Sequence, residues 1–257
     1  MFLLLLYGCS FFNEYKYVTK KLKNSFNREI ISNFSNAIKR DPHNSLFYLE
    51  RGKSQLDYGD YLDAIKDFNY SLKLNPNPKV FFYRANAKYL YGDYSGAIKD
   101  YEELISKNFS EDHIFYNIAS SHLMLLNYSE AIENYTKSIE YNQDNEYSFL
   151  NRGNAKFKIS DYLGSIKDYE KSLEINKKSY IAFNNMGVSK YKLGKYRKAL
   201  KDFKKSIKLN SHNYNTFYNK SMAYLKIRDF KKACIELKKS IKLGKEVFKE
   251  EYLKICS

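Results

Sequence analysis

The stretch FNNMGVSKYKLGKYRKALKDFKKSIKLN, residues 183–210, contains the pattern that decides the fold of this chain. In its second half Tyr196, Leu200, Phe203 and Ile207 recur at the spacing of one helix face. The tripeptide LGK separates this half from a first half that is equally helical in character. The stretch therefore predicts two helices joined by a tight turn.

The same pattern recurs along the chain every 34 residues, with one deletion near the start. The second halves share an aromatic residue, then a small one, then a large apolar one: Tyr61/Ala64/Phe68, Tyr94/Ala97/Tyr101, Tyr128/Ala131/Tyr135, Tyr162/Ser165/Tyr169, Tyr196/Ala199/Phe203 and Phe230/Ala233/Leu237. The first halves share an aromatic residue four positions before a small one: Tyr48/Gly52, Phe81/Ala85, Phe115/Ala119, Phe149/Gly153, Phe183/Gly187 and Phe217/Ser221. Small residues let two helices approach closely, and aromatic residues fill the space between layers. Six copies in register predict a repeat protein.

The repeated spacing of aromatic, Gly or Ala, Gly-x-Tyr and Ala-x3-Phe/Tyr resembles the tetratricopeptide repeat (TPR) family. The family's usual Trp is Phe or Tyr here, and its closing Pro remains only at Pro42 and Pro76. The resemblance implies an all-α chain, a right-handed superhelical solenoid of antiparallel helix pairs, with about seven repeats and a C-terminal cap helix. The register predicts a degenerate copy at 11–44, repeats at 45–77, 78–111, 112–145, 146–179, 180–213 and 214–247, and the cap at 248–257.

In the TPR family the first helix of each repeat lines a concave wall, and one ligand-facing position lies two residues before the small residue. Four consecutive repeats carry asparagine there: Asn117, Asn151, Asn185 and Asn219. The resemblance implies a ladder of carboxamides that binds the backbone of an extended peptide or protein segment. Further candidates on the same wall are Asn86, Asn154, Lys158, Lys192 and Lys226. The alternative is that asparagine is merely common at this position of the repeat.

Charge is unevenly distributed along a chain whose formal net charge is +15. Residues 93–147 hold 11 acids and 3 lysines, a net of −8, whereas residues 196–257 hold 17 Lys/Arg and 6 acids, a net of +11. The lysines of 193–210, continued by Lys231, Lys232, Lys238 and Lys239, are expected on the outer helix face. A solvated face is one interpretation, and a binder of nucleic acid or anionic surfaces is the other.

Motifs for catalysis are missing from the sequence, so we predict a non-catalytic interaction scaffold without cofactor or metal. There is no GxSxG, Gly-rich phosphate loop or HExxH. His113 and His122 are interpreted as surface or packing residues. The three cysteines show no spacing typical of a disulfide framework, and Cys234 occupies a position that is apolar in other repeats, which places it in the core.

The N-terminal sequence MFLLLLYGCS contains an apolar run too short to span a bilayer. Leu6-Tyr7-Gly8-Cys9 resembles a bacterial lipobox, so Cys9 is a candidate for lipidation and for anchoring the chain to a bacterial envelope membrane. Tyr7 and the lack of a basic n-region depart from that pattern, which a translation start further upstream would explain in part. The alternatives are an apolar first turn packed under the repeats and a cytoplasmic protein.

Overall fold

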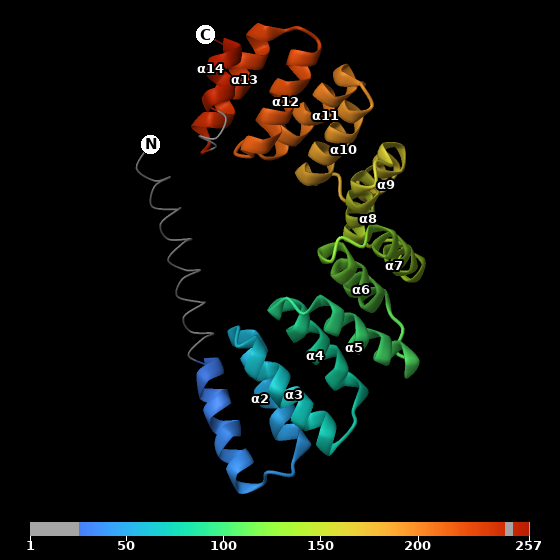
Figure 1. Cartoon of the computed structure of the whole chain (residues 1–257), viewed down its shortest axis with the longest axis vertical. Helices are drawn as coiled ribbons and strands as arrows, with labels where there is room; N and C mark the ends of the chain where they lie inside the picture. Colours follow the sequence, from blue (N-terminus) through green and yellow to red (C-terminus); the bar gives the residue numbers. More distant parts are fainter. Residues whose placement is uncertain (1–25, 245–248, 257) are drawn as a thin grey trace. The chain divides into compact units, whose positions relative to one another are not determined.

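The computed structural model describes residues 26–244 and 249–256, and every regular element in these ranges is an α-helix (Figure 1). The chain divides into two compact units, Met1–Ser110 and Glu111–Ser257. The prediction of an all-α protein built from packed helix pairs is confirmed. Cys9 and the first helix expected for 11–44 lie outside the described residues.

Unit 1, Met1–Ser110, contains a helix whose described part covers 26–40, followed by two helix pairs. These are α2 (Ser45–Tyr58) with α3 (Tyr61–Leu74) and α4 (Pro78–Tyr91) with α5 (Tyr94–Ser106). Each of α2 to α4 packs against the next helix along the chain.

Unit 2, Glu111–Ser257, contains four helix pairs and a short terminal helix. The pairs are α6 (Asp112–Met124) with α7 (Tyr128–Tyr141), α8 (Glu146–Lys158) with α9 (Tyr162–Ile175), α10 (Tyr180–Lys192) with α11 (Tyr196–Leu209), and α12 (Tyr214–Lys226) with α13 (Phe230–Lys242). The terminal helix is α14 (Lys249–Cys256), and it packs against α13. Within this unit α6, α8 and α10 lie on the inner side of the curve that the pairs describe, and α7, α9 and α11 lie on the outer side (Figure 1).

Local signals in the sequence start and stop these helices. The side chains of Asn145 and Ser179 accept hydrogen bonds from backbone N–H groups in the first turns of α8 and α10, which satisfies donors that have no partner inside the helix. Gly92 ends α4 with φ of 99°, a conformation that glycine adopts without a steric penalty. The turns between paired helices are short, so the two helices run antiparallel.

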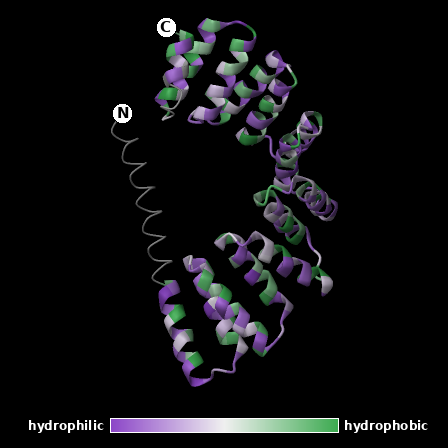
Figure 2. Cartoon of the chain, in the orientation of Figure 1, coloured by the Kyte–Doolittle hydropathy of each residue, from purple (hydrophilic) through white to green (hydrophobic). Residues whose placement is uncertain are grey.

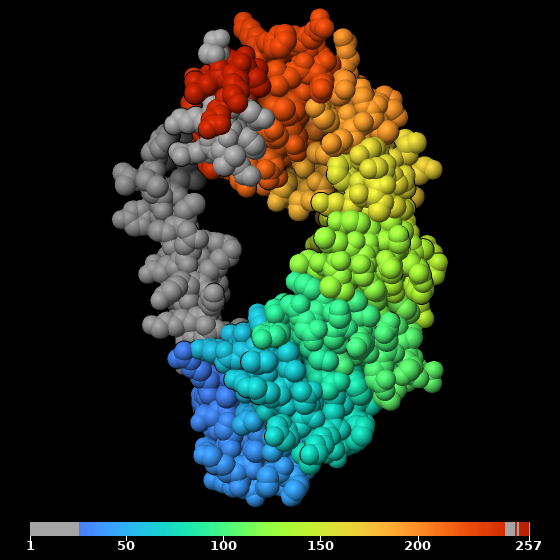
Figure 3. Space-filling view, in the orientation of Figure 1, coloured from blue at the N-terminus to red at the C-terminus, as the bar shows by residue number. Residues whose placement is uncertain are grey.

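The core repeats the small and aromatic pattern of the sequence. Phe68, Tyr101, Tyr135, Tyr169 and Phe203 are at most 1% exposed, and each comes from the second helix of its pair. In Figure 2 every helix carries both hydrophobic and hydrophilic residues, as expected where one face is buried and the other is solvated. In Figure 3 the helix pairs of unit 2 pack side by side without a break from α6 to α12.

Candidate functional site

An open cavity of about 410 Å³ lies on unit 2, lined by residues of α6 to α10. Its apolar lining comes from Leu123, Leu126, Phe157 and Val188. Its polar lining comes from Tyr128, Asn154, Lys158, Tyr169 and Asn185. Three residues predicted for the ligand-facing wall, Asn154, Lys158 and Asn185, therefore line one cavity together with apolar side chains. A cavity of this mixed lining suits an apolar side chain whose backbone needs hydrogen-bond partners.

The position of Tyr169 follows from the glycine opposite it. A Cβ atom on Gly153 would lie 2.8 Å from the Tyr169 ring, so in this repeat glycine lets the ring approach α8 more closely than a larger residue would without a shift of the ring. The Tyr169 hydroxyl donates a hydrogen bond of 2.9 Å to Oδ1 of Asn154. Burial raises the pKa of this hydroxyl above its ordinary value, so it stays protonated and continues to donate.

The asparagines of the inner wall form a hydrogen-bonded chain across three helices. Asn151 donates to the Tyr116 hydroxyl at 2.9 Å, and Asn154 donates to Asn151 at 3.3 Å. Asn185 donates to Asn154 at 2.9 Å, which links α10 to α8.

The chain continues from α10 to α12 through Asn184, a residue that the sequence did not single out. Asn184 donates to Asn185 and Asn219 donates to Asn184, each at 3.0 Å. The amides therefore hold one another in place between repeats. A carboxamide has two N–H groups and an oxygen that accepts two hydrogen bonds. Each of these amides donates one of its two N–H groups within the chain of hydrogen bonds.

Two predicted asparagines have other surroundings. Asn86 lies on α4 in unit 1, where its side chain accepts a hydrogen bond from the buried Tyr101 hydroxyl. The backbone carbonyl of Asn117 on α6 accepts a hydrogen bond from Ser121 at 2.8 Å. Neither residue lines the cavity. The cavity is therefore lined by two of the predicted asparagines, Asn154 and Asn185.

Leu126 is a cavity residue that the sequence reasoning missed. It has a φ of 63° and is 67% exposed, an unusual conformation and location for a large apolar residue. The equivalent turn positions of other repeats include Gly92 and Gly194, both also at positive φ. Ser160 and Arg228 occupy the same turn position in two further repeats, also at positive φ, so Leu126 differs from the other turns in its large apolar side chain. An exposed large apolar side chain that lines a cavity is a reason to look for a ligand there.

Buried ion pairs hold the inner helices in place. Arg152 on α8 binds both carboxylate oxygens of Asp168 on α9, at 3.0 and 2.7 Å, and also donates to Thr136 on α7. Lys156 lies 2.8 Å from the same carboxylate. Arg152 thus joins three helices. The equivalent pairs in other repeats are Arg51–Asp67, Arg84–Asp100, Lys190–Asp202 and Lys220–Glu236.

The predicted wall lysines Lys158, Lys192 and Lys226 are all exposed, near the ends of α8, α10 and α12. The lysines of the outer helices are exposed too, among them Lys201, Lys204 and Lys238. Positive charge therefore lies on both sides of the helix layer in unit 2.

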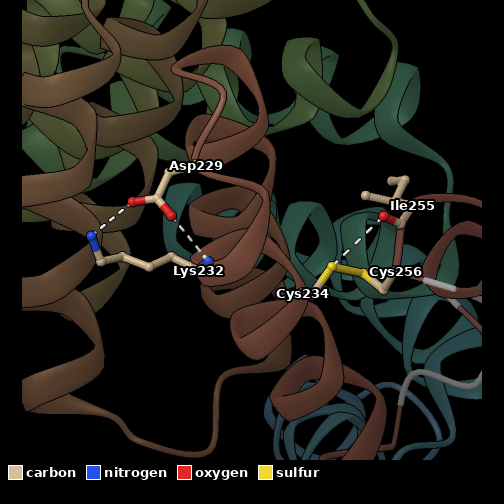
Figure 4. The surroundings of a disulfide bond; sticks show 5 residues. All are labelled: Asp229, Lys232, Cys234, Ile255 and Cys256. Atoms are coloured by element: carbon tan, nitrogen blue, oxygen red, sulfur yellow. Dashed lines mark hydrogen bonds and ion pairs between the residues drawn. A yellow bond between two sulfur atoms is a disulfide. The ribbon is translucent and has the colours of Figure 1, made fainter.

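The predictions that the cysteines form no disulfide and that Cys234 lies in the core are wrong. Cys234 on α13 and Cys256 on α14 form a disulfide with a Cα–Cα distance of 5.6 Å (Figure 4). Cys234 is half-buried and not part of the core. Its Sγ lies 3.9 Å from the Ile255 carbonyl oxygen. The bond fixes the last helix to the last repeat.

Other chemistry is not apparent in the part of the chain that the structure describes. His113 lies 3.2 Å from Glu111 near the start of α6, whereas His122 at its other end has a buried Nδ1. No group of three His, Cys, Asp or Glu among the described residues could hold a metal ion. None of the described helices combines the length and apolarity needed to cross a bilayer.

Sequence models of one repeat family match most of the chain. Residues 49–113, 112–145, 180–213 and 214–244 match models described as tetratricopeptide repeat. Among curated proteins, none matches the chain.

Solved structures similar to this chain are repeat proteins of the same kind. The C-terminal part of a TPR repeat-containing protein from Cytophaga hutchinsonii has a TM-score of 0.76 and 17% identity, over 95% of this chain and 99% of that one. A tetratricopeptide repeat protein from Parabacteroides merdae has a TM-score of 0.64 and 20% identity, over 95% of each chain. YrrB, described as a TPR protein with an unusual peptide-binding site, has a TM-score of 0.63 and 16% identity, over 73% of this chain and 97% of its own. At these identities the similarity shows the fold.

Proposed function

The chain belongs to the tetratricopeptide repeat family, and on that premise we propose that it is a non-catalytic adaptor that binds an extended segment of a partner protein. Binding takes place on the inner wall of unit 2. The observation that carries this proposal is the cavity in which Asn154 and Asn185 lie beside Leu126. Similarity to YrrB, whose description includes a peptide-binding site, supports it.

Each side of the cavity has its own role in binding. The apolar side, with Leu126 and Phe157, receives one side chain of the segment. The amide side, with Asn154 and Asn185, binds the backbone next to it. Backbone binding selects an extended conformation and tolerates many side chains. The asparagine chain from Tyr116 to Asn219 keeps the amides oriented before the ligand arrives, which reduces the entropic cost of binding.

The test begins with selection of binding peptides from a displayed random library on the purified chain. Affinities of the selected peptides are then measured by fluorescence polarisation for wild type, Leu126→Gly and Asn185→Ala. Leu126→Gly removes the apolar wall and relieves the positive φ, so the variant keeps its fold. We expect about tenfold weaker binding for each variant, the size of losing one buried side chain or one hydrogen-bond partner.

The matched control is Asn134→Ala on the outer helix α7, where the side chain only donates to the Glu130 carbonyl. This variant should bind as wild type does. Unchanged affinity in both Leu126→Gly and Asn185→Ala would show that the cavity is not the site. The alternative site, the lysines of the outer helices α11 and α13, is supported by their exposure. Binding there would fall steeply with salt and ignore both cavity variants.

A further inference from the structure

Three lysines on the inner wall of unit 2 occupy the same place in three successive repeats. Lys158, Lys192 and Lys226 each lie five residues after the small residue of their helix, and each is exposed. Lys158 also lines the cavity. Helices α8 and α10 are in contact, as are α10 and α12, so the three lysines form a row that starts at the cavity and runs across the helices.

Acidic residues are almost missing from the helices that carry this row. Helices α10 and α12 contain no Asp or Glu, and the only acid of α8 is Glu146, its first residue. Among the described contacts, none gives the three lysines an ion-pair partner. Asp161 and Asp229 directly precede α9 and α13, where their carboxylates accept hydrogen bonds from backbone N–H groups of those helices.

The other cations of the inner helices are already neutralised. Arg152 and Lys156 share Asp168, Lys190 binds Asp202, and Lys220 binds Glu236, all with acids at most 9% exposed. These pairs face the space between the helices of each repeat. The lysine row is therefore the part of the inner wall whose positive charge remains for a ligand.

The distance between neighbouring lysines of the row sets the interval between the charges that a complementary peptide should carry. Packed helices lie about 10 Å apart, and an extended peptide advances about 3.3 Å per residue. A peptide that crosses the helices along the row therefore passes one lysine about every third residue. Opposite charges placed at this interval would meet all three lysines at once.

We propose, on the basis of the peptide-binding function above, that the partner segment is acidic: one apolar side chain enters the cavity beside Leu126, and carboxylates at about every third residue pair with Lys158, Lys192 and Lys226. The charge pairs are exposed, so they contribute modestly one by one and are screened by salt. Their combined role is to choose acidic segments and to speed association.

Synthetic peptides that carry one Leu anchor test this proposal. One probe has Glu at every third position after the anchor, a second has Gln and a third has Lys at those positions, and a reversed-order set covers the opposite chain direction. Binding to the purified chain is measured by fluorescence polarisation at low and high salt. We expect the Glu probe to bind about tenfold tighter than the Gln probe at low salt, with most of this difference lost at high salt.

Two charge-reversed proteins locate the effect. The inner variant is Lys158→Glu/Lys192→Glu/Lys226→Glu, and the outer control is Lys201→Glu/Lys204→Glu/Lys238→Glu on α11 and α13, with the same change in net charge. Circular dichroism checks that both retain their helices, which exposed substitutions should not disturb. The inner variant should lose the preference for Glu and gain one for Lys, whereas the outer control should bind as wild type does.

The outcomes separate the two proposals. If Glu and Gln probes bind alike and both depend on Leu126 and Asn185, the acidic preference is wrong and the peptide-binding function stands. If the preference for Glu is lost in the outer control, the anion-binding surface is the outer face of α11 and α13, which overturns the inference. If no probe responds to any inner-wall substitution, both proposals fail.

Discussion

The pair α8–α9 and the pair α10–α11 have the same backbone arrangement but hold a buried aspartate differently. Asp168 on α9 binds two cations, Arg152 and Lys156. Asp202 on α11 binds Lys190 alone, because Met186 stands at the position of the arginine. Burial raises the pKa of Asp202 above its ordinary value, and the hydrogen bond and charge of Lys190 only partly offset this effect.

The difference between the ion pairs of these two helix pairs shows which contacts the repeat needs. The pair α6–α7 goes further, with Ile118 at the arginine position and Asn134 at the aspartate position, and its helices still pack in the same way. What the three pairs share is a small residue facing a buried aromatic ring. Ion pairs therefore adjust the stability of individual repeats, whereas close packing at the small residue determines the fold.

The largest effect is expected from Asp168→Ala. This change leaves Arg152 and Lys156 partly buried without their carboxylate, which should cost about 3–5 kcal/mol of unfolding free energy. Asp202→Ala should cost clearly less, because it strands only Lys190 and removes a carboxylate whose burial is already unfavourable. Urea unfolding followed by circular dichroism, with hydrogen exchange to locate the loss, measures both. Equal losses of unfolding free energy in the two variants would show that the second cation bound by Asp168 makes no difference to stability.

A smaller loss of unfolding free energy, similar in the two helix pairs, is expected when alanine replaces Gly153 or Gly187, the glycines that face the buried aromatic rings. A Cβ at Gly187 would lie 2.6 Å from Phe203, and one at Gly153 would lie 2.8 Å from Tyr169. Overpacking of this kind costs about 1–3 kcal/mol, from which the better helix propensity of alanine subtracts up to about 1 kcal/mol. Thermal unfolding of Gly153→Ala and Gly187→Ala should show similar shifts. A much larger loss in one pair would mean that packing is not the shared element.

The helix pairs themselves could be predicted from the sequence, since the 34-residue recurrence of small and aromatic residues is a direct consequence of close helix packing. The cavity could be predicted only in part. Asn154, Lys158 and Asn185 follow from the register, whereas Leu126 lies in a turn between two helices, and the periodicity of the helices does not show that its side chain lines the cavity.

Two further features required the three-dimensional arrangement. The Cys234–Cys256 disulfide depends on how α14 folds back on α13, and a separation of 22 residues gives no indication of that contact. The bonds among the asparagines depend on the rotation of neighbouring helices, so the sequence predicted a row of ligand-facing amides but not that Asn185 donates to Asn154.

Met186→Arg would convert the second pair into a copy of the first. The new guanidinium should reach Asp202 as Arg152 reaches Asp168, and the variant should gain about 1 kcal/mol of unfolding free energy, typical of one hydrogen-bonded charged contact. Met186→Leu, which keeps the apolar character, is the control and should change little. Urea unfolding of the two variants beside wild type checks this expectation. Destabilisation by Met186→Arg would mean that α10 packs too tightly to accept the cation.

The smallest expected effect is the pH dependence of stability that comes from the buried Asp202. The pKa of Asp202 in the folded chain lies above its ordinary value of 3.8, so the fold binds this proton more tightly than the unfolded chain does. Its contribution to stability is therefore full below pH 3.8 and declines as pH rises through the folded-state pKa.

Asp202→Asn lacks this titration, so the unfolding free energy of wild type should fall relative to Asp202→Asn across that window. The same comparison made in the Met186→Arg background should be flatter, because a second cation favours the ionised carboxylate. Urea unfolding at a series of pH values from 3 to 7 measures the difference, and a decline that persists with the arginine present would show that the missing cation is not what keeps the pKa of Asp202 raised.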